Sequence, residues 1–383
     1  MFVTRALSLA LAALILMGGT GADEIVFEGR ADDDSLTAME YNRDLFNRVL
    51  GELKDGDTFL VKNSTYWMQG GIYGSDFHNV RILIDGEIKF NDDRSNWPKN
   101  EDGSVVECIY LHDISNVTFT TSSDSPMDGK GVLNGNGRKW WGAIKFLMHK
   151  EDRPRLWHMH HTKNIFIRNL LLLDSPYWSF YSEQSDGLFI RHSDVSARIT
   201  NLDSHDLYDL TAFNTDGWDV TGRNVHIADS NIWNQDDCIS VKDNYIGPSE
   251  DMLFERITCS GLGLVIGSIG ASQVRNITFR DSHLPDTFKG IYLKTRWSDL
   301  PADPSVASIS DILYENILIE RPKQWGIWIG PAQQTGNPCS LLWPHLNAEC
   351  RMSGFQVRCL FSLMRLYVIP PPGLRVENMQ KLL

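Results

Sequence analysis

The sequence predicts an all-β fold, a single-stranded right-handed parallel β-helix whose N-terminal end is capped by one helix. Short apolar segments recur along the chain, many of them introduced by Asn, and the later ones begin about every 25 residues, near positions 165, 190, 225, 252, 277 and 312. Signals for helices almost vanish after residue 53. A fixed period in the twenties without helices is typical of a β-solenoid, whose rungs stack about 4.8 Å apart. An antiparallel sandwich, which also has many short strands, is the alternative.

The capping helix is expected over residues 35–53. Its apolar residues fall at helical spacing, Asp34 or Ser35 offers an N-cap, and Gly56 follows its end. Because the end of a solenoid is an open sheet edge, a helix packed there would protect it. The strands that follow are expected over residues 79–84, 116–119, 164–167, 187–190, 224–227, 252–254, 276–279 and 309–312.

Residues 1–22 have the pattern of a secretory signal peptide. Arg5 precedes an unbroken apolar run over residues 6–17, and the small residues at 20–22 offer a cleavage site. A run of that length is too short to span a bilayer. We therefore expect residues 23–350 to form a secreted β-helical domain. Residues 351–383 reverse the charge balance of the chain, and we expect this tail to lie outside the β-helix.

Composition and charge limit the class of protein. Hydrophobic residues make up 42% and charged residues 22% of the 383-residue chain, which excludes a mostly disordered protein. The formal net charge of -13 argues against nucleic acid and against an anionic membrane as partners. The 12 Trp and 11 Tyr residues suit carbohydrate binding, but they suit core packing equally well.

Secretion gives the six cysteines a meaning, because close pairs form disulfides in an oxidising compartment. The pairs Cys238–Cys259 and Cys339–Cys350 are close enough to be plausible, although six cysteines allow about 15 connectivities. No cysteine or histidine spacing favours structural zinc. Sequons for N-glycosylation, which also fit secretion, begin at Asn63, Asn116 and Asn276.

The residues that could carry chemistry lie between positions 214 and 296. Asp216 precedes Asp237 by 21 residues, Leu262 follows 25 residues later, and Tyr292 another 30 residues later, which is close to the rung period. A solenoid therefore places these positions above one another on one face. Repulsion among Asp216, Asp236 and Asp237 would keep one carboxyl protonated at acidic pH. Such a site holds both an acid and a base, as the cleavage of a glycosidic bond requires.

Each candidate also has a plainer structural interpretation. Asp and Asn often stack at the turns of a β-helix, and we interpret Asp219 as structural. We interpret His158, His160 and His161 as polar loop residues before a strand rather than as metal ligands. Six tryptophans could stack on sugars, and we expect at least half of them to lie in the core instead. The six are Trp97, Trp140, Trp141, Trp178, Trp297 and Trp328.

The acidic motifs, in this order and spacing, resemble those of the polygalacturonase-type glycoside hydrolases, family 28. The resemblance runs from about residue 24 to 350. The segments that carry it are 214–217, 235–238, 261–268 and 292–294, with further matches at 129–137, 140–141 and 174–178. It implies a pectin-lyase-like right-handed β-helix that hydrolyses pectin with inversion, without a cofactor or a metal ion.

By position, the resemblance also implies roles for single residues. Asp236 would be the general acid, and Asp216 and Asp237 would hold and activate the attacking water. Inverting enzymes place acid and base about 6.5–9.5 Å apart to fit that water. Asn214 and Lys294 would contact the substrate.

Two positions depart from the usual family pattern. Leu262 stands where the family usually has the His of a Gly-His-Gly motif, and Tyr292 stands where it usually has Arg. Because Tyr cannot replace a bidentate guanidinium, the subsite at Tyr292 is expected to have lost a carboxylate partner, whereas Lys294 is retained. The resemblance also implies the Cys238–Cys259 disulfide.

These observations lead to one function and three rivals. We expect a secreted monomer that hydrolyses pectin. The Gly-Leu-Gly form at 261–263 and the segment 325–334 resemble the exo-acting fungal branch, including rhamnogalacturonan-directed members. The rivals are a polygalacturonase acting on homogalacturonan, a calcium-dependent pectate lyase, and a β-helix that binds pectin without turnover.

Overall fold

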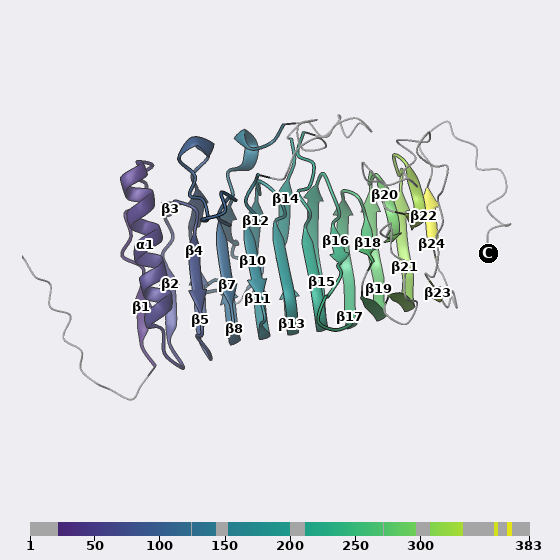
Figure 1. The fold of residues 1–383 in the computed structure, drawn as a ribbon, viewed down its shortest axis with the longest axis horizontal. Coiled ribbons are helices and arrows are strands. Elements are labelled where there is room, and N and C mark those ends of the chain that lie inside the picture. Colours follow the sequence, from purple (N-terminus) through teal and green to yellow (C-terminus); the bar gives the residue numbers. More distant parts are fainter. Residues whose placement is uncertain are drawn as a thin grey trace, which may run out of the picture.

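The strands of the chain stack into one continuous parallel array, drawn in Figure 1. The computed structural model describes residues 22–123, 125–142, 152–199, 211–270, 272–295, 307–331, 356–358 and 366–369. The predicted signal peptide up to residue 21, Trp297 and the Cys339–Cys350 pair lie outside these ranges. Every pairing between named strands in the described part is parallel, which confirms a parallel β-helix. No helix of the described part is long and apolar enough to cross a membrane.

The strands form three columns that run the length of the stack. The first column holds β1 (Glu24–Val26), β2 (Thr58–Val61), β5 (Arg81–Ile84), β8 (Ser115–Thr120), β11 (Lys163–Arg168) and β23 (Gln356–Arg358). It also holds one part of each of five longer strands, β13 (Phe180–Arg191), β15 (Trp218–Asn234), β17 (Ser249–Ser260), β19 (Gln273–Pro285) and β21 (Ser308–Glu320).

The second column holds β3 (Thr65–Met68), β6 (Glu87–Phe90), β9 (Gly131–Asn134), β12 (Leu170–Leu173), β14 (Asp194–Ala197), the later parts of β15, β17, β19 and β21, and β24 (Leu366–Ile369). The third column holds β4 (Ile72–Ser75), β7 (Ile109–His112), β10 (Trp157–His160), the first parts of β13 and β15, β16 (Ile239–Val241), β18 (Leu264–Ile269), β20 (Lys289–Thr295) and β22 (Trp325–Pro331). Two short 3-10 helices, η1 (Arg94–Asn96) and η2 (Gly137–Lys139), lie in the connections.

All eight segments that the sequence predicted as strands lie in the first column. Its strands follow turns whose Asn residues adopt left-handed backbone, with φ of 55° at Asn79, 54° at Asn116 and 52° at Asn164. Asn tolerates this conformation better than most residues. The Asn116 amide donates to Asn79 Oδ1 at 2.9 Å, and the Asn164 amide donates to Asn116 Oδ1 at 3.0 Å. This asparagine ladder explains why the repeat is visible in the sequence.

Helix α1 (Leu36–Glu52) lies at the N-terminal end of the stack (Figure 1), as predicted. The Ser35 hydroxyl caps it by accepting from the amide of Ala38 at 3.2 Å. Phe46 is buried, with its ring centroid 4.9 Å from that of Phe59 in β2. The helix therefore covers the first rung with apolar side chains.

The C-terminal tail differs from the prediction. Strands β23 and β24 pair with β21 and add a partial rung to the first and second columns, although the whole tail was expected to lie outside the β-helix. The physical reason is that the edge of β21 offers unpaired backbone groups to any extended segment. Within the described residues the third column ends at β22, where Ile327 and Ile329 are 39% and 45% exposed.

Candidate active site

Three carboxylates meet at the third column of strands. Asp216 lies two residues before β15, and Asp236 and Asp237 lie in the turn from β15 to β16. One oxygen of each lies within 4.8 Å of the others. All three side chains are buried, with Asp237 fully so. The fold thus brings together the three residues that the sequence singled out.

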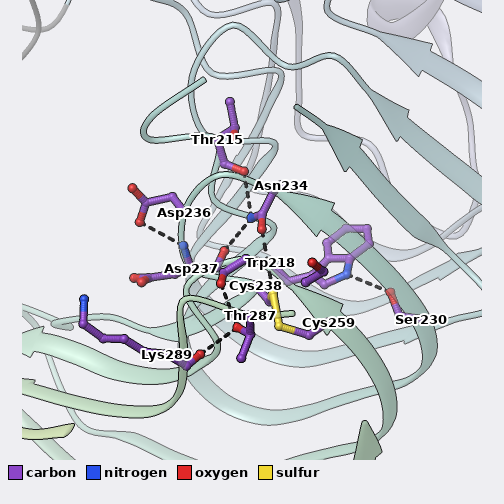
Figure 2. The surroundings of a disulfide bond; sticks show 12 residues. Thr215, Trp218, Ser230, Asn234, Asp236, Asp237, Cys238, Cys259, Thr287 and Lys289 are labelled. Carbon is purple, nitrogen blue, oxygen red and sulfur yellow. Dashed lines mark hydrogen bonds between the residues drawn. A yellow bond between two sulfur atoms is a disulfide. The ribbon is translucent and has the colours of Figure 1, made fainter. Parts of the chain in front are cut away.

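Buried polar contacts hold the turn that carries Asp237. The Asn234 amide donates to the backbone carbonyls of Thr215 at 2.9 Å and of Asp237 at 2.8 Å, which ties two successive turns together. The predicted disulfide between Cys238 and Cys259 joins the same turn to the next rung (Figure 2). These restraints fix the backbone from which the carboxylates project.

The Gly-Leu-Gly segment packs directly against this turn. The Leu262 amide donates to the Asp236 carbonyl at 2.7 Å, so Leu262 lies at the site although its side chain cannot titrate. Gly261 is required because a Cβ there would lie 1.9 Å from Asn234 Oδ1. Gly263 adopts a φ of +91°, which favours glycine.

Two lysines neutralise part of the cluster. Lys294 Nζ lies 2.6 Å from Asp237 Oδ2, and Lys242 Nζ lies 3.0 Å from Asp216 Oδ2 and 3.2 Å from Asp219 Oδ2. Sequence analysis identified Lys294 and missed Lys242. The signal was present, since Lys242 follows Asp216 by 26 residues, close to one rung.

The two adjacent carboxyls are driven toward opposite protonation states. Burial and the negative charges of Asp216 and Asp237 raise the pKa of Asp236 to about 8. Burial also acts to raise the pKa of Asp237, but the ammonium groups of Lys294 and Lys242 outweigh it and hold that pKa below its usual value. The site therefore holds a protonated carboxyl and a carboxylate at the same pH.

Asp236 is positioned by backbone donors. Its Oδ1 accepts from the amide of Asp237 at 2.8 Å, and its Oδ2 accepts from the amide of Asn214 at 3.1 Å. Asn214 thus contacts the predicted acid through its backbone. By contrast, Oδ1 of Asp216 and Oδ1 of Asp237 have no hydrogen-bond partner among the described residues. These two oxygens, like Oδ1 of Asp219, are acceptors left open to a water molecule.

The distance between the carboxylates does not by itself decide the stereochemistry. The nearest oxygens lie within 4.8 Å, whereas inverting enzymes commonly separate acid and base by about 6.5–9.5 Å and retaining enzymes by about 5–5.5 Å. The 4.8 Å distance is measured between the closest carboxylate oxygens. The ranges for inverting and retaining enzymes are measured between whole carboxyl groups, so the distances are not directly comparable. The stereochemistry of the reaction therefore depends on the unpartnered oxygens of Asp216 and Asp237 rather than on the distance between the carboxyl groups.

The same three oxygens have a spacing that could suit a divalent cation, but the donor set argues against one. The ammonium groups of Lys242 and Lys294 already contact Asp216 and Asp237 and would repel a metal ion. Within the described ranges, these three aspartates are the one group of three or more His, Cys, Asp or Glu side chains that lie close enough together to hold a metal ion.

The histidines belong to a strand, which corrects their interpretation as loop residues before one. His158 and His160 lie on β10, where they alternate with the buried Trp157 and Met159, and His161 directly follows. The alternation of a strand explains the pattern, because every second side chain points away from the core.

A row of rings extends from the cluster toward the N-terminal end of the third column. Tyr73, Tyr110, His158 and Tyr181 occupy paired positions on successive strands. Their ring centroids are 6.1, 4.9 and 5.0 Å apart in that order. Trp178, half-buried, packs on Tyr181 at 5.3 Å. We call these five residues the aromatic row.

The charges beside the aromatic row are mainly negative. Glu183 lies 3.5 Å from the His158 ring nitrogen, and the Arg155 guanidinium is already paired with Glu107. The Lys242 ammonium lies 4.7 Å from the Trp178 ring and separates the row from the acidic cluster. Of the tryptophans considered for sugar stacking, Trp97, Trp140 and Trp141 are buried, as expected for core residues, and Trp178 and Trp328 are partly exposed.

Tyr292 lies on the other side of the cluster. It occupies the same line of paired positions as Asp219 and is only 3% exposed. Two ammonium groups lie over its ring, that of Lys289 at 4.5 Å and that of Lys294 at 4.9 Å from the centroid. Lys289 is a second residue of the site that the sequence analysis missed.

The family comparison identifies the class of protein to which this parallel β-helix with clustered aspartates belongs. Residues 73–342 match the family model described as glycosyl hydrolases family 28. The chain belongs to this family.

Two curated relatives of the chain are named as endopolygalacturonases. The chain is 30% identical to endopolygalacturonase A of Aspergillus niger over 266 residues, and 30% identical to a probable endopolygalacturonase A of Aspergillus kawachii. Each alignment covers 68% of this chain and 64% of the relative, so it spans less than two thirds of the relative.

Solved structures share the fold. Endo-xylogalacturonan hydrolase from Aspergillus tubingensis superimposes with a TM-score of 0.65 at 18% identity, covering 82% of this chain and 78% of that one. An exopolygalacturonase from Thermotoga maritima gives a TM-score of 0.59 at 18% identity, covering 80% and 75%.

Proposed function

We propose that this protein hydrolyses glycosidic bonds of pectic polysaccharides. Asp236 protonates the oxygen of the leaving sugar, and Asp216 and Asp237 hold the attacking water. Asp237, whose pKa is lowered, takes the proton of that water, since burial raises the pKa of Asp216. The observation that carries the proposal is a pair of adjacent buried carboxyls with different surroundings. Lys294 Nζ lies 2.6 Å from Asp237 and lowers its pKa, whereas burial and two neighbouring carboxylates raise the pKa of Asp236 to about 8. Enzymes commonly obtain an acid and a base from two carboxyls in this way.

We propose that hydrolysis inverts the anomeric configuration. Two unpartnered oxygens, one on Asp216 and one on Asp237, offer a water molecule two acceptors at once. A retaining mechanism would instead have one carboxylate bond covalently to the sugar, with no water attacking in the first step. Proton NMR of the first product released distinguishes the two mechanisms, because a retained anomer would refute inversion.

For the substrate, we propose rhamnogalacturonan, in which neutral rhamnose alternates with acidic galacturonate, attacked from the chain end. The aromatic row, with carboxylates beside it, suits a neutral sugar on one side of the cluster. The lysines around Tyr292 suit an acidic sugar on the other side. Exo action rests on the resemblance at 261–263 and 325–334.

Homogalacturonan is the second candidate substrate, since the curated relatives are named endopolygalacturonases. Product analysis on purified rhamnogalacturonan and polygalacturonate separates the two. Release of monomers or dimers from rhamnogalacturonan supports the first candidate, and rapid loss of viscosity of polygalacturonate supports the second. Unsaturated products that depend on calcium would indicate a lyase, and binding without any product would indicate a non-catalytic protein.

We also propose that the protein is secreted as a glycosylated monomer. The predicted signal peptide, the Cys238–Cys259 disulfide and the sequons support this. Asn63 is exposed and outside the asparagine ladder, whereas the amide of Asn116 donates within the ladder and that of Asn276 donates to Asp251. N-terminal sequencing of the secreted protein should start near Asp23, and light scattering should give the mass of one chain.

A further inference from the structure

Lys289, at the start of β20, is a buried ammonium without an anion. The residue is 5% exposed. Its backbone is fixed, because the Thr287 hydroxyl donates to the Lys289 carbonyl at 2.7 Å. Among the described residues no carboxylate lies within ion-pair distance of its Nζ. Burying a charged group without a partner is unfavourable, so the protein maintains this arrangement at a cost in stability.

The other two lysines of the cluster differ in this respect. The side chains of Lys242 and Lys294 are 13% and 12% exposed, and each contacts a carboxylate, at 3.0 Å to Asp216 and at 2.6 Å to Asp237 respectively. Lys289 is therefore the cation of the cluster that remains available to a ligand. Figure 2 shows its side chain extending toward the side on which Asp236 and Asp237 lie.

The surroundings of Lys289 destabilise its charge when no ligand is present. Burial, followed by repulsion from Lys294, lowers the pKa of Lys289 to about 8. An anion beside the ammonium would reverse both effects, because it would restore a counter-charge and raise the pKa. The charges of Asp236 and Asp237 both act to raise the pKa of Lys289. The ammonium therefore lies within electrostatic reach of the reacting groups.

We propose that the Lys289 ammonium binds the carboxylate of a uronic acid residue of the substrate, next to the bond that is cleaved. The Tyr292 ring, which Lys289 covers at 4.5 Å, forms the floor of this subsite. The subsite therefore keeps a cation, although Tyr292 stands where the family usually has an arginine. This inference rests on the proposed function for the identity of the ligand.

A competing explanation is that Lys289 only adjusts the pKa values of Asp236 and Asp237. Removing the lysine would then shift the pH profile of the reaction and leave substrate affinity unchanged. The two explanations are separated by measuring binding without turnover. An Asp236→Asn protein serves as the background, since it lacks the acid that the reaction needs.

The experiment measures the affinity of this background for trigalacturonate and for its methyl ester by calorimetry. Adding Lys289→Met should weaken the binding of trigalacturonate about 10- to 100-fold, because a hydrogen bond to a charged group is lost. Binding of the uncharged ester should be unchanged. Affinity for the acid should also fall at alkaline pH in the background, as Lys289 loses its proton, and not in the Lys289→Met protein. Lys163→Met, which removes an exposed lysine of β11 in another column, is the matched control and should have no effect.

Either of two results would overturn the proposal. One is equal affinity for trigalacturonate with and without Lys289, and the other is an equal loss for the acid and the ester. Lys289→Arg guards against a folding defect, because it keeps the charge and should retain most of the affinity. If the parent protein hydrolyses no pectic polymer but binds trigalacturonate through Lys289, the proposed function fails and this inference stands.

Discussion

At the scale of single residues, Asp236 is the test of the proposed reaction. Replacing it with Asn keeps its size but removes the proton that the leaving oxygen needs. We expect Asp236→Asn to lower kcat by about 10²- to 10⁴-fold, the usual contribution of acid catalysis, while circular dichroism stays unchanged. The control is Asp229→Asn, which removes a carboxylate paired with Arg256 away from the site. More than about a tenth of the activity in the Asp236→Asn protein would remove Asp236 from the role of acid.

The protonation states also predict the pH dependence of kcat/KM. The reaction needs Asp236 protonated and Asp237 ionised. As the pH rises through about 8, Asp236 loses its proton and the rate should fall. As the pH falls, Asp237 takes up a proton only below its usual range, because its pKa is lowered, so the optimum should lie below neutrality and extend into mild acid. A rate that stays level from mild acid to beyond about pH 9 would contradict the carboxyl pair.

At the scale of elements, the asparagine ladder should contribute measurably to stability. Asn116 lies in left-handed backbone and makes two ladder bonds. We expect Asn116→Ala to lower the free energy of unfolding by about 1–3 kcal/mol, from the lost bonds and from backbone strain. Asn116→Gly should cost less, since glycine accepts this backbone without strain. Equal denaturation midpoints for the two variants would show that backbone strain plays no part.

The capping helix is the second element whose role can be tested. Phe46 is buried and packs on Phe27 and Phe59. Phe46→Ala should destabilise the protein by about 3–5 kcal/mol, the usual range for a buried aromatic residue. Tyr41→Ala, on the exposed side of the same helix, is the control and should change the thermal midpoint little. Similar midpoints for the two variants would mean that the helix does not cap the core.

At the scale of the whole molecule, the two ends of the stack differ. Helix α1 covers the first rung, whereas Trp325, Ile327 and Ile329 of β22 are 38–45% exposed. Open edges with exposed apolar side chains favour association. We expect Ile327→Thr combined with Ile329→Thr to reduce concentration-dependent aggregation without loss of activity. Light scattering at increasing concentration tests this, and unchanged scattering would locate the cause of any aggregation elsewhere.

The sequence predicted one of the three columns of strands and not the other two. All eight predicted strands belong to the first column, because Asn79, Asn116, Asn164 and their counterparts mark its turns. The second and third columns contain strands of about four residues whose turns use varied residues, so no single letter marks them. The prediction for the tail was wrong at β23 and β24 because pairing with an open edge requires only an extended backbone.

Sequence alone determined the β-helix and the meeting of Asp216, Asp236 and Asp237, since both depend on residue types at a rung spacing. It also predicted the capping helix, from helical spacing and an N-cap, and the disulfide, from the proximity of two cysteines and the family resemblance. Only the tertiary structure decided which carboxyl keeps its proton and which lysine remains available. Those properties depend on burial and on distances of a few ångströms between charges, and electrostatic interactions change steeply over such distances in a low-dielectric interior. A residue such as Lys289 is indistinguishable from a surface lysine until the fold encloses it.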